Sequence, residues 1–124
     1  MKITEYVDFI KEQFKDIATE YSFSWRQQND YILFLEKKNV TIEFSTIYRE
    51  DGSIIIIKSS NSKSYDALDL IEKKKIFNNS YLSEEDKQKC KSFNDQIKVS
   101  VYVFYLILSK YCQDVLNGDF NSLK

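Results

Sequence analysis

Apolar residues recur at every second position in short runs between residues 21 and 57. This spacing is typical of half-buried strands, whose successive side chains point to opposite faces of a sheet. Short polar turns separate the runs, and the turn before the last run contains Asp51-Gly52, a pair that favours a tight hairpin. Consecutive strands joined by short turns pair most readily with their neighbours along the chain. The sequence therefore predicts an antiparallel meander of four strands over residues 21–26, 31–36, 40–47 and 54–57.

The segments on either side of these runs carry the spacing of helices. Residues 3–17 place apolar side chains at i, i+3, i+4 and i+7, with charged residues mostly opposite. A short helix is expected over residues 65–74. A longer one begins after Ser83, where acidic residues favour the first turn, and its apolar repeat continues to Leu116. One helix of that length is long for such a small chain, so we expect a break near Phe93-Asn94-Asp95.

The expected fold is a single α+β domain over residues 1–124: a four-stranded antiparallel meander flanked by an N-terminal helix and C-terminal helices. One face of the sheet would carry Phe23, Trp25, Val40, Ile42 and Phe44 toward the helices. The opposite face mixes apolar residues with carboxylates and hydroxyls. Either the C-terminal region covers that face, or it is a partner-binding surface of the kind that exposed apolar patches mark. Its residues would include Ser22, Ser24, Arg26, Thr41, Glu43, Ser45 and Ile47.

The composition argues against most kinds of active site. The chain has no histidine, which is the commonest general base and metal ligand, and its two cysteines cannot form a structural zinc site. Its two separate glycines do not form a phosphate-binding loop. Catalysis by carboxylates alone stays open, but a small meander with helices offers little cleft for it. We therefore expect no enzyme activity, no catalytic residue, no metal site and no cofactor.

The charge and apolar patterns indicate a cytoplasmic protein. The longest apolar run, residues 99–108, is about half of what a bilayer span requires, so no membrane segment is expected. No cleavable signal segment is recognised, and Cys90 and Cys112 are interpreted as reduced thiols. The net charge of −1 is low for a nucleic-acid-binding protein. The lysine-rich segment 73–91 is the one stretch that would suit such a role, although acidic residues lie among its lysines.

Asn117-Gly118-Asp119 near the C-terminus contains one of the two glycines. A helix that ends here needs a residue with a left-handed backbone, which glycine adopts without strain. We interpret the stretch as a helix stop rather than a chemical site, with Phe120 and Leu123 folding back over the helix end.

Two short motifs give the chain a resemblance to a known group of proteins. They are Tyr65-Asp66-Ala67-Leu68-Asp69-Leu70 at a helix start and Leu116-Asn117-Gly118-Asp119-Phe120 at the end of the last helix. With this order of helices and strands, the chain resembles small bacterial immunity proteins associated with polymorphic or contact-dependent toxins. The motifs include no catalytic signature. The oligomeric state does not follow from the resemblance.

The resemblance implies a mechanism in which the chain binds a cognate protein toxin and occludes its active site. Where the toxin is a nuclease, carboxylates of the inhibitor would stand in for phosphates of the substrate. An alternative of the same physical kind is a phage-encoded protein inhibitor of a host nuclease. A small nucleic-acid-binding module is the third hypothesis. The candidate partner-binding residues are Glu36, Glu43, Tyr48, Glu50 and Asp51.

Overall fold

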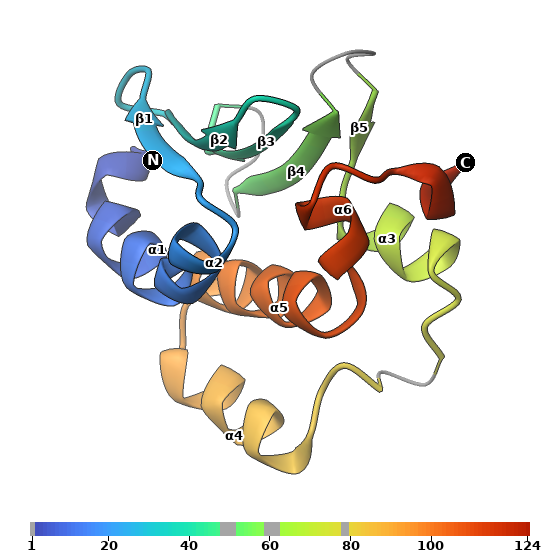
Figure 1. Cartoon of the computed structure of the whole chain (residues 1–124). Helices are drawn as coiled ribbons and strands as arrows, with labels where there is room; N and C mark the ends of the chain where they lie inside the picture. The colour runs from blue at the N-terminus through green and yellow to red at the C-terminus, as the bar shows by residue number, and fades with distance from the viewer. Residues whose placement is uncertain (1, 48–51, 59–62, 78–79) are drawn as a thin grey trace.

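The computed structural model describes residues 2–47, 52–58, 63–77 and 80–124. The described chain is α+β, with one antiparallel sheet whose strands follow one another in chain order (Figure 1). The class and the meander are as predicted, but the sheet has five strands, so the prediction of four was wrong. The strands are β1 (Ser24–Gln27), β2 (Ile32–Lys37), β3 (Val40–Ser45), β4 (Ser53–Lys58) and β5 (Ser64–Tyr65).

The extra strand and the late start of β1 have local causes. Tyr65, predicted to begin a helix, instead pairs with Ile56 as part of β5. The helix begins only after Asp66, whose side chain accepts a hydrogen bond from the Asp69 backbone N–H. Ser22, predicted to lie in the first strand, has a φ of 62° and turns the chain before β1 begins. Two-residue strands and single left-handed residues leave little trace in apolar spacing.

The N-terminal helical segment is divided into three pieces. It consists of η1 (Ile3–Tyr6), α1 (Val7–Gln13) and α2 (Lys15–Glu20). The divide between α1 and α2 falls at Phe14, which is fully buried. The predicted apolar stripe does face the core, since Ile3, Ile10 and Ile17 are also buried. The sequence thus located the buried side of this segment but not its interruption.

The C-terminal half contains α3 (Ala67–Lys73), α4 (Glu84–Phe93), α5 (Gln96–Tyr111), α6 (Gln113–Leu116) and η2 (Asn121–Leu123). The predicted break is confirmed at Asn94, whose left-handed backbone ends α4. The Asp95 side chain then accepts hydrogen bonds from the first turn of α5. A second break, at Cys112, separates α6 from α5 and was not predicted. Each break lets the chain change direction, so that α5 lies against the sheet while α4 does not.

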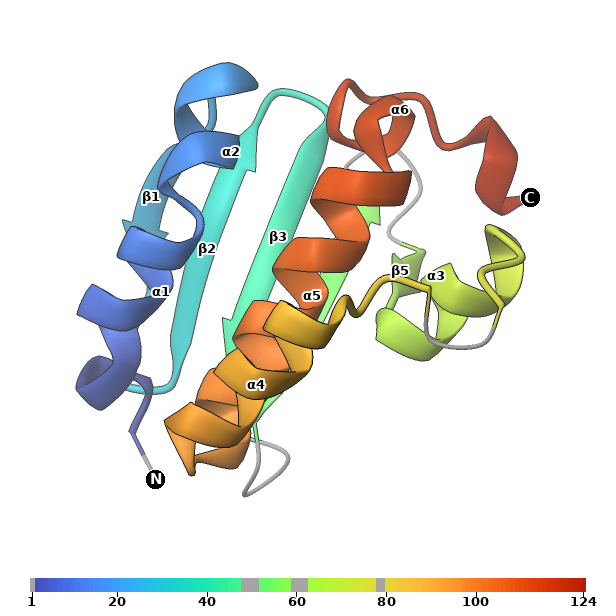
Figure 2. The ribbon, with the colours of Figure 1, turned by 90° about the horizontal axis from the view of Figure 1, so that it is seen from below.

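The described elements form three layers. Helices α1, α2 and α5 lie on one face of the sheet, and α4 lies on the side of α5 away from the sheet (Figures 1 and 2). The core between sheet and helices includes fully buried Leu35, Ile42, Phe44 and Leu108. Helix α4 has no buried residue of its own. Within the described ranges, no helix is long and apolar enough to cross a bilayer.

Polar contacts hold α4 in place. The Tyr102 hydroxyl donates to the Asp86 carboxylate at 2.6 Å, and Lys110 Nζ lies 3.0 Å from the same carboxylate. The ring of Phe93 packs edge-on against Tyr102 with 5.7 Å between centroids. A carboxylate at the start of α4 therefore joins that helix to α5.

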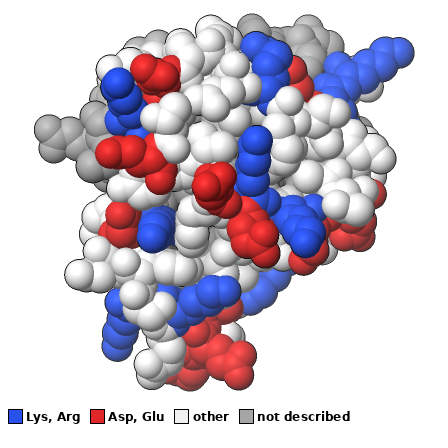
Figure 3. All heavy atoms as spheres, turned by 90° about the vertical axis from the view of Figure 1, so that its left-hand side faces the viewer, with Lys and Arg blue, Asp and Glu red and all other residues white. Residues whose placement is uncertain are grey.

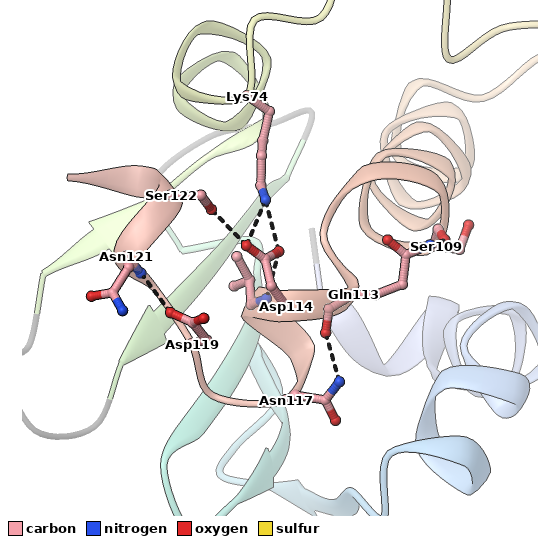
Figure 4. Close-up of polar contacts among 9 residues, drawn as sticks. Lys74, Ser109, Gln113, Asp114, Asn117, Asp119, Asn121 and Ser122 are labelled. Carbon is pink, nitrogen blue, oxygen red and sulfur yellow. Dashed lines mark hydrogen bonds and ion pairs between the residues drawn. The ribbon is translucent and has the colours of Figure 1, made fainter.

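The helix stop predicted at Gly118 is confirmed. Gly118 has a φ of 96°, and its N–H donates to the Val115 carbonyl at 2.9 Å. The Asp119 N–H donates to the Asp114 carbonyl at 2.9 Å, which completes the two-bond pattern of a glycine-ended helix. The Asp119 side chain accepts from the Asn121 N–H (Figure 4). The following apolar residues, Phe120 and Leu123, are buried as expected.

Candidate functional site

The face of the sheet turned away from α1, α2 and α5 is the surface on which the predicted site residues Glu36 and Glu43 lie. The strand register aligns Arg26, Phe34, Glu43 and Ile55 in one row across β1 to β4. A second row runs beside it: Ser24, Glu36, Thr41 and Ile57. We call these two rows the open face. No helix of the described chain covers it in Figure 1.

One end of the open face is an internally paired charge cluster. The Arg26 guanidinium donates to both carboxylate oxygens of Glu36, with Nε–Oε1 at 2.7 Å and Nη2–Oε2 at 3.2 Å. It also lies over the Phe34 ring, 4.4 Å from its centroid. Hydrogen bonding to Glu36 raises the pKa of Arg26 further above its usual value. The Glu36 carboxylate is thus occupied and already neutralised within the chain.

Glu43 is in the opposite situation. It is half-buried, and its neighbours across the strands are the apolar residues Phe34 and Ile55. No other described residue forms a hydrogen bond or an ion pair with its carboxylate. Burial raises the pKa of Glu43 above its usual value, because the charged form loses hydration and gains no partner. A cation brought by another molecule would restore the lost stabilisation.

Only part of the predicted site can be placed. Glu36 and Glu43 share the open face as diagonal neighbours on adjacent strands, since Glu36 is opposite Thr41. The predictions for Tyr48, Glu50 and Asp51 fall outside the described residues. Because Glu36 is held by Arg26, the described part of the site offers a single unpaired carboxylate.

The described lysines of segment 73–91 are not all presented on one surface. Lys74 is largely buried and forms an ion pair with Asp114, whereas Lys87 pairs with Glu84 in the exposed first turn of α4. Lys89 lies over the Tyr102 ring at 4.9 Å. Figure 3 shows acidic and basic side chains interspersed on the side of the molecule formed by α1, α2, β1 and α4. The described lysines of this segment therefore have different local roles.

Neither cysteine is activated, and the carboxylates that the structure describes do not gather into a metal-binding group. Burial raises the pKa of the Cys112 thiol to about 12, and burial also raises that of Cys90, with a contribution from Asp86. Neither thiol is thus activated as a thiolate. Among the described residues, no three histidine, cysteine, aspartate or glutamate side chains are grouped to hold a metal ion.

The structure adds a feature that sequence patterns did not reveal, an open cleft of about 650 Å³ beside β4. Three separate segments line it: the start of β4, the start of α3 and one side of α5. Glu43 also contributes to its lining. Such a cleft depends on where α3 and α5 pack, so no local motif could have indicated it.

A scan against protein-family models, a search of curated proteins and a search of solved structures each found no match to this chain.

Proposed function

We propose that this chain is a non-enzymatic binding protein that neutralises a cognate bacterial toxin by covering the toxin's active site with the open face of its sheet. The observation that carries the proposal is the Glu43 carboxylate, which is half-buried between Phe34 and Ile55 without a described partner. A charge in such a position destabilises the isolated chain. A partner that supplies a cation at this place would remove that cost.

The surroundings of Glu43 suit a protein partner. Ile55 and Ile57 provide apolar area on β4, next to Phe34, whose ring is covered in part by Arg26. The paired Arg26 and Glu36 form a polar border at the β1 side. An apolar centre with a charged border is the usual composition of a protein–protein interface. A basic side chain in a toxin's catalytic cleft would be the natural counterpart of Glu43.

The proposal is tested by expressing the chain together with the product of each neighbouring gene in a growth assay. We expect one neighbour to be toxic alone and harmless in the presence of the chain. Glu43→Lys should abolish the protection, because it places a like charge against the basic partner. Glu12→Lys is the matched control, since it makes the same charge change on the exposed side of α1 and should leave protection intact.

Two results would contradict the proposal. One is that no neighbouring product is toxic, or that none is neutralised by the chain. The other is that Glu43→Lys and Glu12→Lys protect equally well, which would remove the open face as the binding surface even if neutralisation occurs.

A phage-encoded inhibitor of a host nuclease would use the same surface in the same way. Genomic context separates the two, because a phage inhibitor would lie among phage genes with no toxin gene beside it. Inhibition of a host nuclease by the purified chain, lost in Glu43→Lys, would favour this alternative.

A further inference from the structure

The cleft beside β4 lies where the sheet has an unpaired edge. Strand β5 pairs only with Ile56 and Ile57, so Ser53, Ile54 and Ile55 have no neighbouring strand on that side in the described structure. The chain instead turns into α3 after Asp66, and the start of this helix forms one wall of the cleft. The edge that β5 leaves uncovered is therefore the floor of a surface cavity rather than a flat rim.

The hydrogen-bond pattern shows which backbone groups are free. In an antiparallel sheet, successive residues of a strand bond alternately to the strand on either side. The Thr46 N–H donates to the Tyr31 carbonyl, so the backbone N–H and C=O of Thr46 point toward β2. Three residues earlier the direction is reversed, so the backbone groups of Glu43 point toward its partner Ile55 on β4. Ile54, one residue along from Ile55, then directs its N–H and C=O away from β3 and toward the cleft. Among the described residues, no backbone hydrogen bond from a turn, loop or cap occupies these groups.

The walls of the cleft are apolar and incompletely covered. Val99 and Val103 lie one turn apart on α5 and remain partly exposed, whereas Phe104 beside them is buried. Leu68, in the first turn of α3, is 75% exposed, an unusual fraction for a large apolar side chain next to a cavity. These side chains would lose exposed area if an apolar segment entered the cleft.

The charge of the cleft lining is one-sided. Its described residues include the carboxylates of Glu43 and Asp66 and no lysine or arginine. The Asp66 carboxylate already accepts the Asp69 N–H as a helix cap. Glu43 is thus the group available to an incoming cation.

We propose that the edge of β4 binds an extended segment of the partner protein, which pairs with Ile54 as an added strand and places a lysine or arginine near Glu43. This inference rests on the proposed function, because it names the part of the partner that the chain recognises. Strand addition supplies affinity through backbone hydrogen bonds, and the side chains supply selectivity.

The register specifies the sequence pattern of that segment. Side chains of an added strand alternate between the two faces, so a residue beside Ile54 would share the helix face and enter the space next to Val99 and Val103. Asp66, which follows Tyr65 in an extended conformation, takes the place beside Ile55. A residue beside Ser53 would share the open face with Glu43. Strand spacing puts its backbone about 12 Å from that of Glu43, which a long basic side chain and Glu43 can bridge together. The expected pattern is alternating apolar and basic residues.

The test uses the whole chain and a synthetic eight-residue peptide of alternating valine and lysine, with a valine–glutamate peptide as its control. Amide hydrogen exchange is followed by NMR. The lysine peptide should slow exchange of the Ile54 amide at least about tenfold, because that amide gains a partner. The Ile55 amide should change little, since it already bonds to β3. The glutamate peptide should bind weakly.

Three variants locate the site. Leu68→Ser should weaken the lysine peptide by about fivefold, the equivalent of about 1 kcal/mol. Phe77→Ser is the matched control, because Phe77 is 70% exposed but does not line the cleft, and its effect should be less than about twofold. Glu43→Gln should remove most of the preference for lysine over glutamate.

Unchanged exchange at Ile54 in the presence of bound peptide would overturn the proposal, as would equal effects of Leu68→Ser and Phe77→Ser. A chain that is dimeric and already protected at Ile54 would show that a second copy occupies the edge, and would also overturn it. Toxin neutralisation that is lost in Glu43→Lys but unaffected by Leu68→Ser would leave the proposed function standing without this site. Peptide binding at Ile54 by a chain that neutralises no toxin would support this binding site and contradict the proposed function.

Discussion

Lys74 and Asp114 form an ion pair that joins α3 to α6, with Lys74 Nζ 2.7 and 2.8 Å from the two carboxylate oxygens (Figure 4). Only 14% of the Lys74 side chain and 33% of the Asp114 side chain are exposed. The Ser122 hydroxyl donates to the same carboxylate at 2.7 Å. One carboxylate therefore connects α3, α6 and the C-terminal segment.

Replacing Asp114 with alanine should lower the free energy of unfolding by about 2 kcal/mol, because it leaves the Lys74 ammonium largely buried without a counter-charge. Urea unfolding measures the change. Glu84→Ala is the control, since it removes the exposed Lys87–Glu84 pair and should cost less than about 0.5 kcal/mol. Similar losses in the two variants would show that burial of the Lys74 pair has no energetic effect.

Stability should fall in acid as Asp86 and Asp114 take up protons. Burial alone would raise both pKa values. For Asp86, however, hydrogen bonds from Tyr102, Ser83 and Lys110 outweigh burial and hold the pKa well below its usual range. Hydrogen bonds from Lys74 and Ser122 lower the pKa of Asp114 in the same way. Groups with a lowered folded pKa contribute stability above the unfolded pKa of about 4, and this contribution is lost as pH falls.

Urea midpoints measured from pH 7 to pH 2 check this expectation. We expect little change from Asp86 and Asp114 above about pH 5 and a steep loss below about pH 4. The Asp86→Asn variant should be less stable at neutral pH and should show a shallower acid loss. An acid profile identical to that of the unaltered chain would contradict the assigned role of Asp86.

Glu43→Gln should have opposite effects on stability and on binding. Burial raises the pKa of Glu43 in the folded chain, so folding favours the protonated side chain. The stability that this gives is fully present below the unfolded pKa of Glu43 and is lost as pH rises through its folded pKa. Removing the charge should therefore stabilise the isolated chain at pH 7 by about 0.5 kcal/mol and have no such effect at pH 3. The same variant should bind the toxin less tightly. Urea unfolding at the two pH values, with calorimetric binding at pH 7, tests both parts; a destabilised variant at pH 7 would mean that Glu43 has a favourable partner.

Gly118→Ala should destabilise the chain by about 1–2 kcal/mol, because its φ of 96° is strained for a residue with a Cβ atom. Space is not the cause, since the nearest heavy atom to a Cβ placed there is 3.8 Å away on Asn39. Gly118→Asn should cost less, because asparagine tolerates left-handed backbone better. Thermal unfolding of the two variants gives the comparison, and an equal loss for both would point to packing instead of backbone strain.

Features set by local chemistry could be predicted from the sequence. The stop at Gly118 and the break at Asn94 each depend on a few adjacent residues, and both occur where expected. Strand alternation also predicted that Val40, Ile42 and Phe44 would face the helices, and all three are buried. Interruptions at Phe14 and Cys112 could not be predicted, because apolar spacing continues on both sides of them.

Features that depend on distant contacts could not be predicted. Arg26 and Glu36 were assigned to neighbouring strands, but their pairing requires the exact register. Glu43 was a candidate because of its charge, whereas its distinguishing property is the absence of a described counter-charge. The cleft beside β4 required the positions of α3 and α5 together. The sequence thus placed Glu36 and Glu43 on one face of the sheet without distinguishing the occupied carboxylate from the unpaired one.

The meander order of the sheet also has a consequence for biosynthesis. Each strand pairs with its neighbour along the chain, so the hairpins can form one after another with short loop closures. The inner face is completed only by α5, and the Tyr6 hydroxyl reaches Asp95 at the start of that helix, 89 residues away. At translation rates of about 5–20 residues per second, α5 follows β4 by several seconds. During that interval α1 and α2 are already made, but the part of the inner face on β4 that α5 contacts lacks its cover. The nascent meander is therefore a stage at which this chain exposes apolar surface to aggregation.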